Sequence, residues 1–356
     1  MYEKINCYSI NCIIKSLMNA RYFCVLGVVI SIACAPKIEE EQVLEADLIF
    51  SSRIPEKEWI RVSADSIDRV FVDDNIACIV SEKEKKGHFF LTLFNLGSGE
   101  KIGSYYPYGS EIGEVLLPFF TKSQHQLLMY DPVKKMAGII DIPVILDSVD
   151  YHPMLFHTNI FSQEIIPFKK RLLFLNPNSF DGKAPRVIIS DRNWNYEERH
   201  KYSFDASNVV DGSLQYNPSR KKIAFLADYI PVIEIMNENG APIRRIHFPH
   251  SVCDFETVYH SNSNITEYLY PYRSSPTFPD YSFCGSDSNE DYIACIYWRE
   301  DWTYVILILD WEGHIIDGFN PVNKVIQISI SSDGKRVFCW ESEENNSVLR
   351  EYAILQ

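Results

Sequence analysis

The clearest pattern along the chain is a series of apolar runs separated by short polar turns, and it is sharpest between Asn289 and Phe319. Tyr292 to Trp298 and Tyr304 to Leu309 are rich in β-branched and aromatic residues, with a polar turn between them. A second turn at Trp311-Glu312-Gly313 leads into His314 to Phe319. Runs of this composition and length are typical of strands, so the pattern predicts one antiparallel meander of three strands.

The same unit recurs along the chain. Polar turns that lead into apolar strands begin at steps of 50, 45, 50, 71 and 43 residues, in the stretches VDDNIACIV (72–80), KSQHQLLMY (122–130), PFKKRLLFL (167–175), NPSRKKIAFL (217–226), SNEDYIACIY (288–297) and SSDGKRVFCW (331–340). This spacing is typical of the four-stranded blades of a β-propeller. The longest step indicates an insertion, which the sequence places near 259–283.

A second repeated pattern, a glycine three positions before an isoleucine, supports the same division into blades. Gly99, Gly240 and Gly313 each precede an isoleucine by three positions, at the point where the third strand of a blade is expected to end. Glycine adopts positive φ at little cost, so each of these residues is predicted to sit in the turn between the third and fourth strands.

The last unit shows three strands, near 325–331, 336–340 and 348–355, whereas an additional run at Leu48 to Arg61 precedes the first blade. We expect that run to supply the missing outer strand, because closing the ring removes a free sheet edge. The predicted fold class is therefore all-β, a six-bladed β-propeller of four-stranded antiparallel blades over 45–356. Seven blades is the alternative.

An apolar run of 12 residues, 22–33, follows Arg21. The run is short for a membrane span and has the flanks of a secretory signal, so 1–33 is predicted to be a signal peptide, with Met18 as a candidate true start. Ser31-Ile32-Ala33-Cys34 resembles the lipobox of bacterial lipoproteins, although Ser31 stands where leucine is usual. The resemblance implies lipidation of Cys34 and attachment to a membrane, and a cleaved but unlipidated signal is the alternative.

Residues 34–44 are acidic and lack apolar periodicity, which predicts a flexible tether. The cluster Lys37-Ile38-Glu39-Glu40-Glu41 resembles the acidic surface-export signal of Bacteroidetes lipoproteins, and a solvated linker is the other open interpretation. The expected location is the outer membrane, on a lipoprotein that is surface-exposed or faces the periplasm.

The cysteines fall into two groups. Cys78, Cys295 and Cys339 lie in apolar strand runs and are expected to be buried thiols. Cys253 and Cys284 lie in loop-like sequence and form the plausible disulfide, whose pairing stays open. The cysteine and histidine spacings do not match a zinc site, so no metal and no cofactor is expected.

The chain from 45 to 356 resembles the TolB-like six-bladed propeller lipoproteins of Bacteroidetes. The resemblance is carried by the lipobox, by NPSRKKIAFLADYIPVIEIMNENGAPIRRI (217–246) and by the closing segments YVILILDWEGHIIDGF and ISISSDGKRVF. These motifs are patterns of strands and turns, and the family offers no catalytic signature to transfer to particular residues. The resemblance implies an architecture and a location.

The sequence contains no GxSxG, HExxH, Walker or GxGxxG motif. In a propeller, one mouth of the central channel is lined by the loops that enter the innermost strands and by those that join the second and third strands. In this chain these loops carry rings and charged groups suited to a glycan, a peptide or a protein partner, with simple decoration of β-loops by tyrosine as the competing interpretation. The candidate ligand-binding residues are Tyr106, His152, Asp228, Tyr229, Tyr270, Tyr272, Arg273, Arg299, Asp301 and Trp302.

The formal net charge of -14 argues against nucleic acid as a partner. The favoured function is a membrane-anchored, non-enzymatic propeller that presents a binding face to a glycan, peptide or protein. The alternative is an envelope polysaccharide hydrolase or lyase, with Asp228, Asp301 and His152 as first choices for acid and base. A structural subunit of an envelope assembly is a third hypothesis, which predicts an exposed apolar patch away from the channel.

Overall fold

The computed structural model describes residues 38–63, 67, 69–81, 87–147, 151–160, 162, 164–175, 187–191, 193–195, 212–228, 231–249, 283–299 and 303–355. The chain divides into two units, Met1–Ile38 and Glu39–Gln356. The predicted signal peptide, Cys34 and residues 259–282 of the predicted insertion lie outside the described residues.

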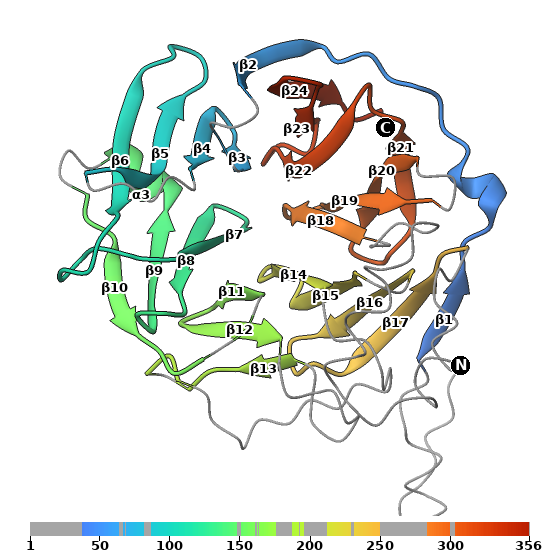
Figure 1. Ribbon diagram of the computed structural model, residues 1–356. Coiled ribbons are helices and arrows are strands. Elements are labelled where there is room, and N and C mark those ends of the chain that lie inside the picture. The colour runs from blue at the N-terminus through green and yellow to red at the C-terminus, as the bar shows by residue number, and fades with distance from the viewer. Residues whose placement is uncertain are drawn as a thin grey trace, which may run out of the picture. The chain divides into compact units, whose positions relative to one another are not determined.

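The described strands form six sheets arranged as blades around a ring, so the predicted six-bladed β-propeller is confirmed (Figure 1). From the innermost strand outward, blade 1 contains β3 (Arg69–Asp73), β4 (Ile76–Val80), β5 (Phe89–Asn95) and β6 (Lys101–Pro107), and blade 2 contains β7 (Phe119–Ser123), β8 (Gln126–Asp131), β9 (Met136–Asp141) and β10 (Met154–His157). Blade 3 contains β11 (Ile165–Phe168), β12 (Arg171–Leu175) and β13 (Val187–Ile189) among the described residues.

The other three blades follow the same order. Blade 4 contains β14 (Gly212–Asn217), β15 (Lys222–Ala227), β16 (Val232–Asn237), β17 (Pro242–His247) and β1 (Glu39–Gln42). Blade 5 contains β18 (Phe283–Ser288), β19 (Tyr292–Trp298), β20 (Tyr304–Asp310) and β21 (Ile315–Phe319). Blade 6 contains β22 (Lys324–Ile330), β23 (Arg336–Ser342), β24 (Asn346–Ala353) and β2 (Lys57–Ser63). The described helices are short, namely the 3-10 helix η1 (Glu45–Leu48) and α3 (Ile142–Asp147).

Each of the two repeated sequence patterns falls at the same place in every blade in which it occurs. The six stretches in which a polar turn leads into an apolar strand coincide with the hairpins between the first and second strands of the six blades. Gly99, Gly240 and Gly313 lie between the third and fourth strands of blades 1, 4 and 5, with φ of 73°, 75° and 92°. The positive φ confirms the predicted reason for glycine at these turns.

Buried apolar side chains hold the ring together. They form six clusters, one at each junction between neighbouring blades. At the junction that closes the ring, Val70 and Val72 of blade 1 pack with Phe338 and Trp340 of blade 6. The predicted strand cysteines Cys78, Cys295 and Cys339 are buried free thiols within these clusters, as expected.

The N-terminal belt, residues 39–63, runs along the outside of blades 4, 5 and 6 (Figure 1). Its last part, β2, pairs with β24 as the outermost strand of blade 6, which confirms the predicted closure, although the strand begins at Lys57 and not at Leu48. Between the two belt strands, Arg53 bonds both carboxylate oxygens of Asp317 at 2.8 and 2.9 Å. The belt therefore ties three blades to one another.

The first part of the belt differs from the expected flexible tether over 34–44. Residues 39–42 form β1, which pairs in parallel with β17, from Glu39 opposite Arg244 to Gln42 opposite His247. Glu40 contacts Arg245 at 2.9 Å and His247 at 2.7 Å. Opposite charges across the two strands explain why an acidic segment without apolar periodicity forms a strand here.

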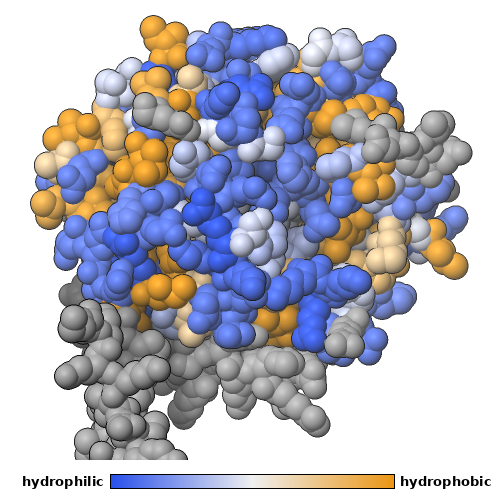
Figure 2. Space-filling model, turned by 180° about the vertical axis from the view of Figure 1, so that it is seen from behind, coloured by the Kyte–Doolittle hydropathy of each residue, from blue (hydrophilic) through white to orange (hydrophobic). Residues whose placement is uncertain are grey.

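The face turned away from the viewer in Figure 1 is mostly hydrophilic across its centre, and its hydrophobic groups form separate patches nearer the rim (Figure 2). Among the residues that the structure describes, no helix has the length and apolar character needed to cross a membrane.

Candidate functional site

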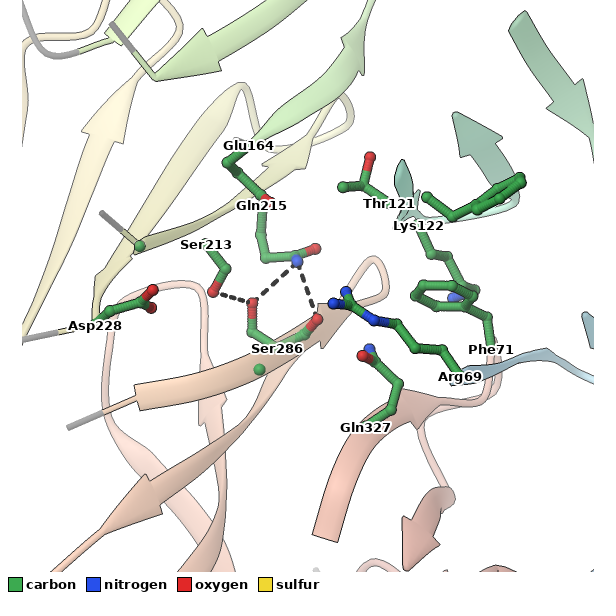
Figure 3. A pocket seen from close by; sticks show the side chains of 13 residues that line it. Arg69, Phe71, Thr121, Lys122, Glu164, Ser213, Gln215, Asp228, Ser286 and Gln327 are labelled. Carbon is green, nitrogen blue, oxygen red and sulfur yellow. Dashed lines mark hydrogen bonds between the residues drawn. The ribbon is translucent and has the colours of Figure 1, made fainter. Parts of the chain in front are cut away.

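A cavity of about 260 Å³ lies in the central channel, and all six blades contribute to its wall. Most of the lining residues belong to the innermost strands. They are Arg69, Phe71, Phe120, Thr121, Lys122, Glu164, Gly212, Ser213, Gln215, Asp228, Gly285, Ser286 and Gln327. We call this cavity the channel pocket (Figure 3).

The sequence of the innermost strands differs from that of the strands behind them. The second strands, such as β4 with IACIV and β15 with KIAFLA, are almost wholly apolar because blades cover both of their faces. The innermost strands, such as β14 with GSLQYN and β18 with FCGSDS, mix polar and small residues because one of their edges borders the channel. This difference places hydroxyl and amide groups around the pocket.

A buried ion pair joins opposite sides of the channel. Lys122 Nζ of β7 lies 2.7 Å from Asp287 Oδ2 of β18, and the two side chains are only 3% and 2% exposed. The same oxygen accepts a hydrogen bond from the backbone N–H of Ile330 at 3.0 Å. Burial by itself lowers the pKa of Lys122, but the carboxylates of Asp287 and Asp73 raise it overall, so the ammonium stays charged.

A network of hydroxyl and amide groups forms one side of the pocket. Gln215 Nε2 donates to Ser286 Oγ at 3.0 Å and to the Ser286 carbonyl at 3.3 Å, while its Oε1 accepts from Ser288 Oγ at 2.8 Å. Ser213 Oγ and Ser286 Oγ lie 2.8 Å apart. These bonds join β14 to β18 and fix the orientation of the polar groups (Figure 3).

Glu164 lies just before β11, and its carboxyl belongs to the pocket lining. Its carboxyl accepts a hydrogen bond from the Leu214 N–H at 3.1 Å. Burial raises the pKa of Glu164 to about 7, against the opposing effects of that N–H and of the Arg69 guanidinium. The residue is half-buried, because the surrounding blades remove bulk water while the pocket still reaches the carboxyl.

Two basic side chains share the pocket with Glu164. Arg69 begins β3 and extends toward the middle of the pocket, whereas Lys122 lies behind Phe71 (Figure 3). Phe71 and Phe120 also line the pocket, and both are largely buried in the cluster between blades 1 and 2. The pocket thus combines fixed donors and acceptors, two cations, two carboxyls and a small apolar surface.

Of the residues predicted from sequence, Asp228 lines the pocket. It follows β15 and lies at the edge of the lining group, beyond Ser213 (Figure 3). Arg299 lies elsewhere, since its guanidinium donates to the Leu48 carbonyl of the N-terminal belt. The structure therefore does not bring Arg299 into the pocket with Asp228.

Two further predicted residues lie away from the pocket. Tyr106 is only 3% exposed and packs in the cluster between blades 1 and 2, where its ring contacts Phe120 at a centroid distance of 5.8 Å. His152 is exposed and precedes β10. Tyr229, Tyr270, Tyr272, Arg273, Asp301 and Trp302 lie outside the described residues, as does Cys253 of the suggested disulfide.

No group of three or more histidine, cysteine or acidic side chains placed to hold a metal occurs in the described part of the chain.

Most of the lining was not predicted from the sequence, including Arg69, Glu164, Gln215, Ser286 and Gln327. The predicted residues belong mainly to loops expected at the channel mouth, whereas these side chains come from the innermost strands or directly precede them. The usable signal was the polar character of the strand before each apolar second strand.

Comparison with known proteins supports the fold and leaves the chemistry of the pocket unassigned. No protein-family model matches the chain, and no curated protein matches it. The chain is similar to the crystal structure of a member of the DUF4221 family from Bacteroides vulgatus ATCC 8482, with a TM-score of 0.51 and 8% sequence identity, over 86% of this chain and 98% of that one. It is also similar to KlHsv2 with loop 6CD replaced by a Gly-Ser linker, with a TM-score of 0.40 and 10% identity, over 75% and 73% of the two chains. At 8% identity the first similarity shows a shared propeller fold, and the resemblance to TolB-like lipoproteins stays a prediction.

Proposed function

We propose that the chain is a binding module that holds a small polar ligand, or the end of a larger one, in the channel pocket. The observation that carries the proposal is the polar lining contributed by all six blades around one cavity. Ligand sites in proteins are typically concave and carry a few fixed polar groups on an otherwise apolar frame. The channel pocket is concave and the Gln215 network supplies fixed polar groups, although its frame is more polar than is typical.

A plug variant tests the proposal. Ser213→Trp places a large ring in the pocket, whereas Asn239→Trp places the same ring in the exposed turn after β16 and serves as the matched control. We expect the wild-type chain and the control to retain a ligand from an extract of glycans and short peptides, measured by native mass spectrometry, and the plug variant to lose it. Equal retention by the plug variant would contradict the proposal.

A second function has one observation in its favour, which is that Glu164 and Asp228 line the same pocket and that the Glu164 pKa is about 7. Glycoside hydrolases use two carboxyls that flank the scissile bond, one of which acts as the acid with a raised pKa. As a hydrolase, the chain would release 4-nitrophenol from 4-nitrophenyl glycosides, and Glu164→Gln would abolish the release without abolishing binding. Binding without turnover by the wild-type chain would exclude this function for the glycosides tested.

The location that we propose rests on the sequence, namely a lipoprotein of the outer membrane anchored through Cys34. In a bacterial host that lipidates such signals, the chain should enter the membrane fraction and incorporate labelled palmitate, and Cys34→Ala should abolish both. Residues 1–33 retained on the membrane-bound chain would instead indicate an uncleaved signal segment.

A further inference from the structure

We propose that the ligand of the channel pocket is an uncharged sugar, bound as one or two rings at the end of a free or polymeric glycan. This inference rests on the proposed function, because it names the ligand class of the same pocket. It follows from the balance of charge in the pocket, from the kind of polar groups that line it and from its size.

The ionisable side chains of the lining balance one another. The lining contains two basic residues, Arg69 and Lys122, and two acidic residues, Glu164 and Asp228. Lys122 is already paired at 2.7 Å with Asp287, which lies outside the lining, and Glu164, with a pKa of about 7, is ionised only in part at neutral pH. Arg69 and Asp228 are then the lining charges that offset each other. A charged ligand would lose its hydration without meeting an excess of opposite charge, which is unfavourable in a partly enclosed site. The balance therefore favours an uncharged ligand.

The uncharged lining groups match sugar hydroxyls. Ser213, Ser286 and Thr121 present hydroxyls, and Gln215 and Gln327 present amides. Several of their donors are already used, because Thr121 Oγ1 donates to the Ile165 carbonyl, Gln215 Nε2 to Ser286 and Gln327 Nε2 to the Ile328 carbonyl. Their oxygens keep lone pairs that can accept from a ligand, and Ser213 can contact Ser286 and still do so. Sugar hydroxyls can donate to these acceptors, whereas a wholly apolar ligand would leave them unmatched. The Arg69 guanidinium adds N–H donors to the lining.

The aromatic residues of the wall and the volume of the pocket restrict the class of ligand further. The phenyl rings of Phe71 and Phe120 offer an apolar surface suited to the C–H face of a sugar ring. The volume of about 260 Å³ lies just below the roughly 300 to 1,000 Å³ typical of sites for drug-sized ligands. One or two sugar rings fit such a space, whereas a long glycan can enter only by its end.

The experiment measures binding of defined sugars to the full-length chain at pH 7 by calorimetry and by the shift in melting temperature. The uncharged probes are D-glucose, D-galactose, D-mannose and N-acetyl-D-glucosamine, and the charged counterparts are D-glucuronate and D-glucosamine. We expect at least one uncharged sugar to bind one site per chain, about tenfold or more tighter than either charged counterpart. Ser213→Trp and the milder Gln327→Leu should weaken this binding by about tenfold or more, and Asn239→Trp should leave it unchanged.

The other outcomes separate the two proposals. Tighter binding of D-glucuronate or D-glucosamine, with the same response to the variants, would overturn the assignment of an uncharged sugar and leave the pocket as the binding site. Failure of all six probes to bind would overturn the sugar assignment, while a peptide that binds and is lost in Ser213→Trp would keep the proposed function. Sugar binding that neither pocket variant weakens would overturn the pocket as the site, and with it the proposed function.

Discussion

The carboxyl of Glu164, in the channel, changes its protonation near neutral pH. Its titration therefore makes the free energy of unfolding depend on pH. Its pKa is about 7 in the folded chain, against an ordinary value of 4.5. The folded chain therefore keeps a proton that the unfolded chain releases between pH 4.5 and 7. The free energy of unfolding falls across that interval and then stays at the lower level.

Glu164→Gln should remove this cost, because glutamine stays neutral and its amide oxygen can still accept from the Leu214 N–H. At about 1.4 kcal/mol per pKa unit, the shift from 4.5 to about 7 corresponds to roughly 3.5 kcal/mol, so the variant should gain up to about that much over the wild type at pH 8 and little at pH 4, measured by urea unfolding. Glu238→Gln is the matched control, for which the expected change in stability at pH 8 has the opposite sign. Burial opposes the effect of Lys169 and Tyr216, which lower the pKa of Glu238 overall, so this variant should lose stability at pH 8. A Glu164→Gln chain no more stable than wild type at pH 8 would contradict the assignment.

The ion pair between Lys122 and Asp287 leads to a second prediction. Lys122→Met leaves the buried Asp287 carboxylate without its partner, so the free energy of unfolding should fall by about 3 to 5 kcal/mol. Adding Asp287→Asn removes the uncompensated charge and keeps an acceptor for the Ile330 N–H, so the double variant should recover much of the loss. Lys169→Met, which breaks an exposed pair with Glu238, should cost less than about 1 kcal/mol. Equal losses from the two lysine variants would contradict the buried role of Lys122.

At the scale of strands, the second strand of each blade explains why the fold was predictable. A strand covered on both faces reads as a continuous apolar run, and the turn before it must be polar. The pocket was not predictable in the same way, because its walls are one to three residues from each of five innermost strands, together with Glu164 and Asp228, and these meet only when the ring closes. Ser213 and Ser286 illustrate this, since neither is unusual in its own strand and their contact depends on how blades 4 and 5 pack.

The pairing of β1 with β17 can be tested through its charges. Glu40→Lys combined with Glu41→Lys places lysines opposite Arg245, His247 and Arg244, so β1 should separate from β17. Exposed pairs contribute about 0.2 to 1 kcal/mol each, so amide exchange over 39–43 should accelerate by roughly 5- to 30-fold in hydrogen-exchange mass spectrometry. Glu56→Lys is the control, because Glu56 is exposed and lies outside β1, so its charge reversal leaves those ion pairs intact. Unchanged protection in the double variant would show that the charges do not hold β1.

At the scale of the whole molecule, closure depends on β2. Trp59, Ile60 and Val62 pack against the cluster between blades 1 and 6, and Trp59 Nε1 donates to Glu351 at 2.7 Å. A chain that begins at residue 45 should fold with a lower melting temperature, whereas one that begins at residue 65 should aggregate, because the edge of β24 is left open.

A synthetic peptide of residues 45–64 supplied in trans should raise the melting temperature of the shorter chain and reduce its aggregation, measured by light scattering during heating. The same peptide with Trp59→Ala is the control and should act more weakly. A cooperative, soluble chain from residue 65 without peptide would show that blade 6 closes the ring with three strands.

The pairing of β2 with β24 also sets the order of events when the protein is made. Trp59 is synthesised 292 residues before Glu351, its hydrogen-bond partner. A nascent chain can assemble its middle blades as they emerge, yet β2 has no strand to pair with until β24 has been made. A chain released before β24 is made therefore keeps β2 as an unpaired strand, and its ring cannot close.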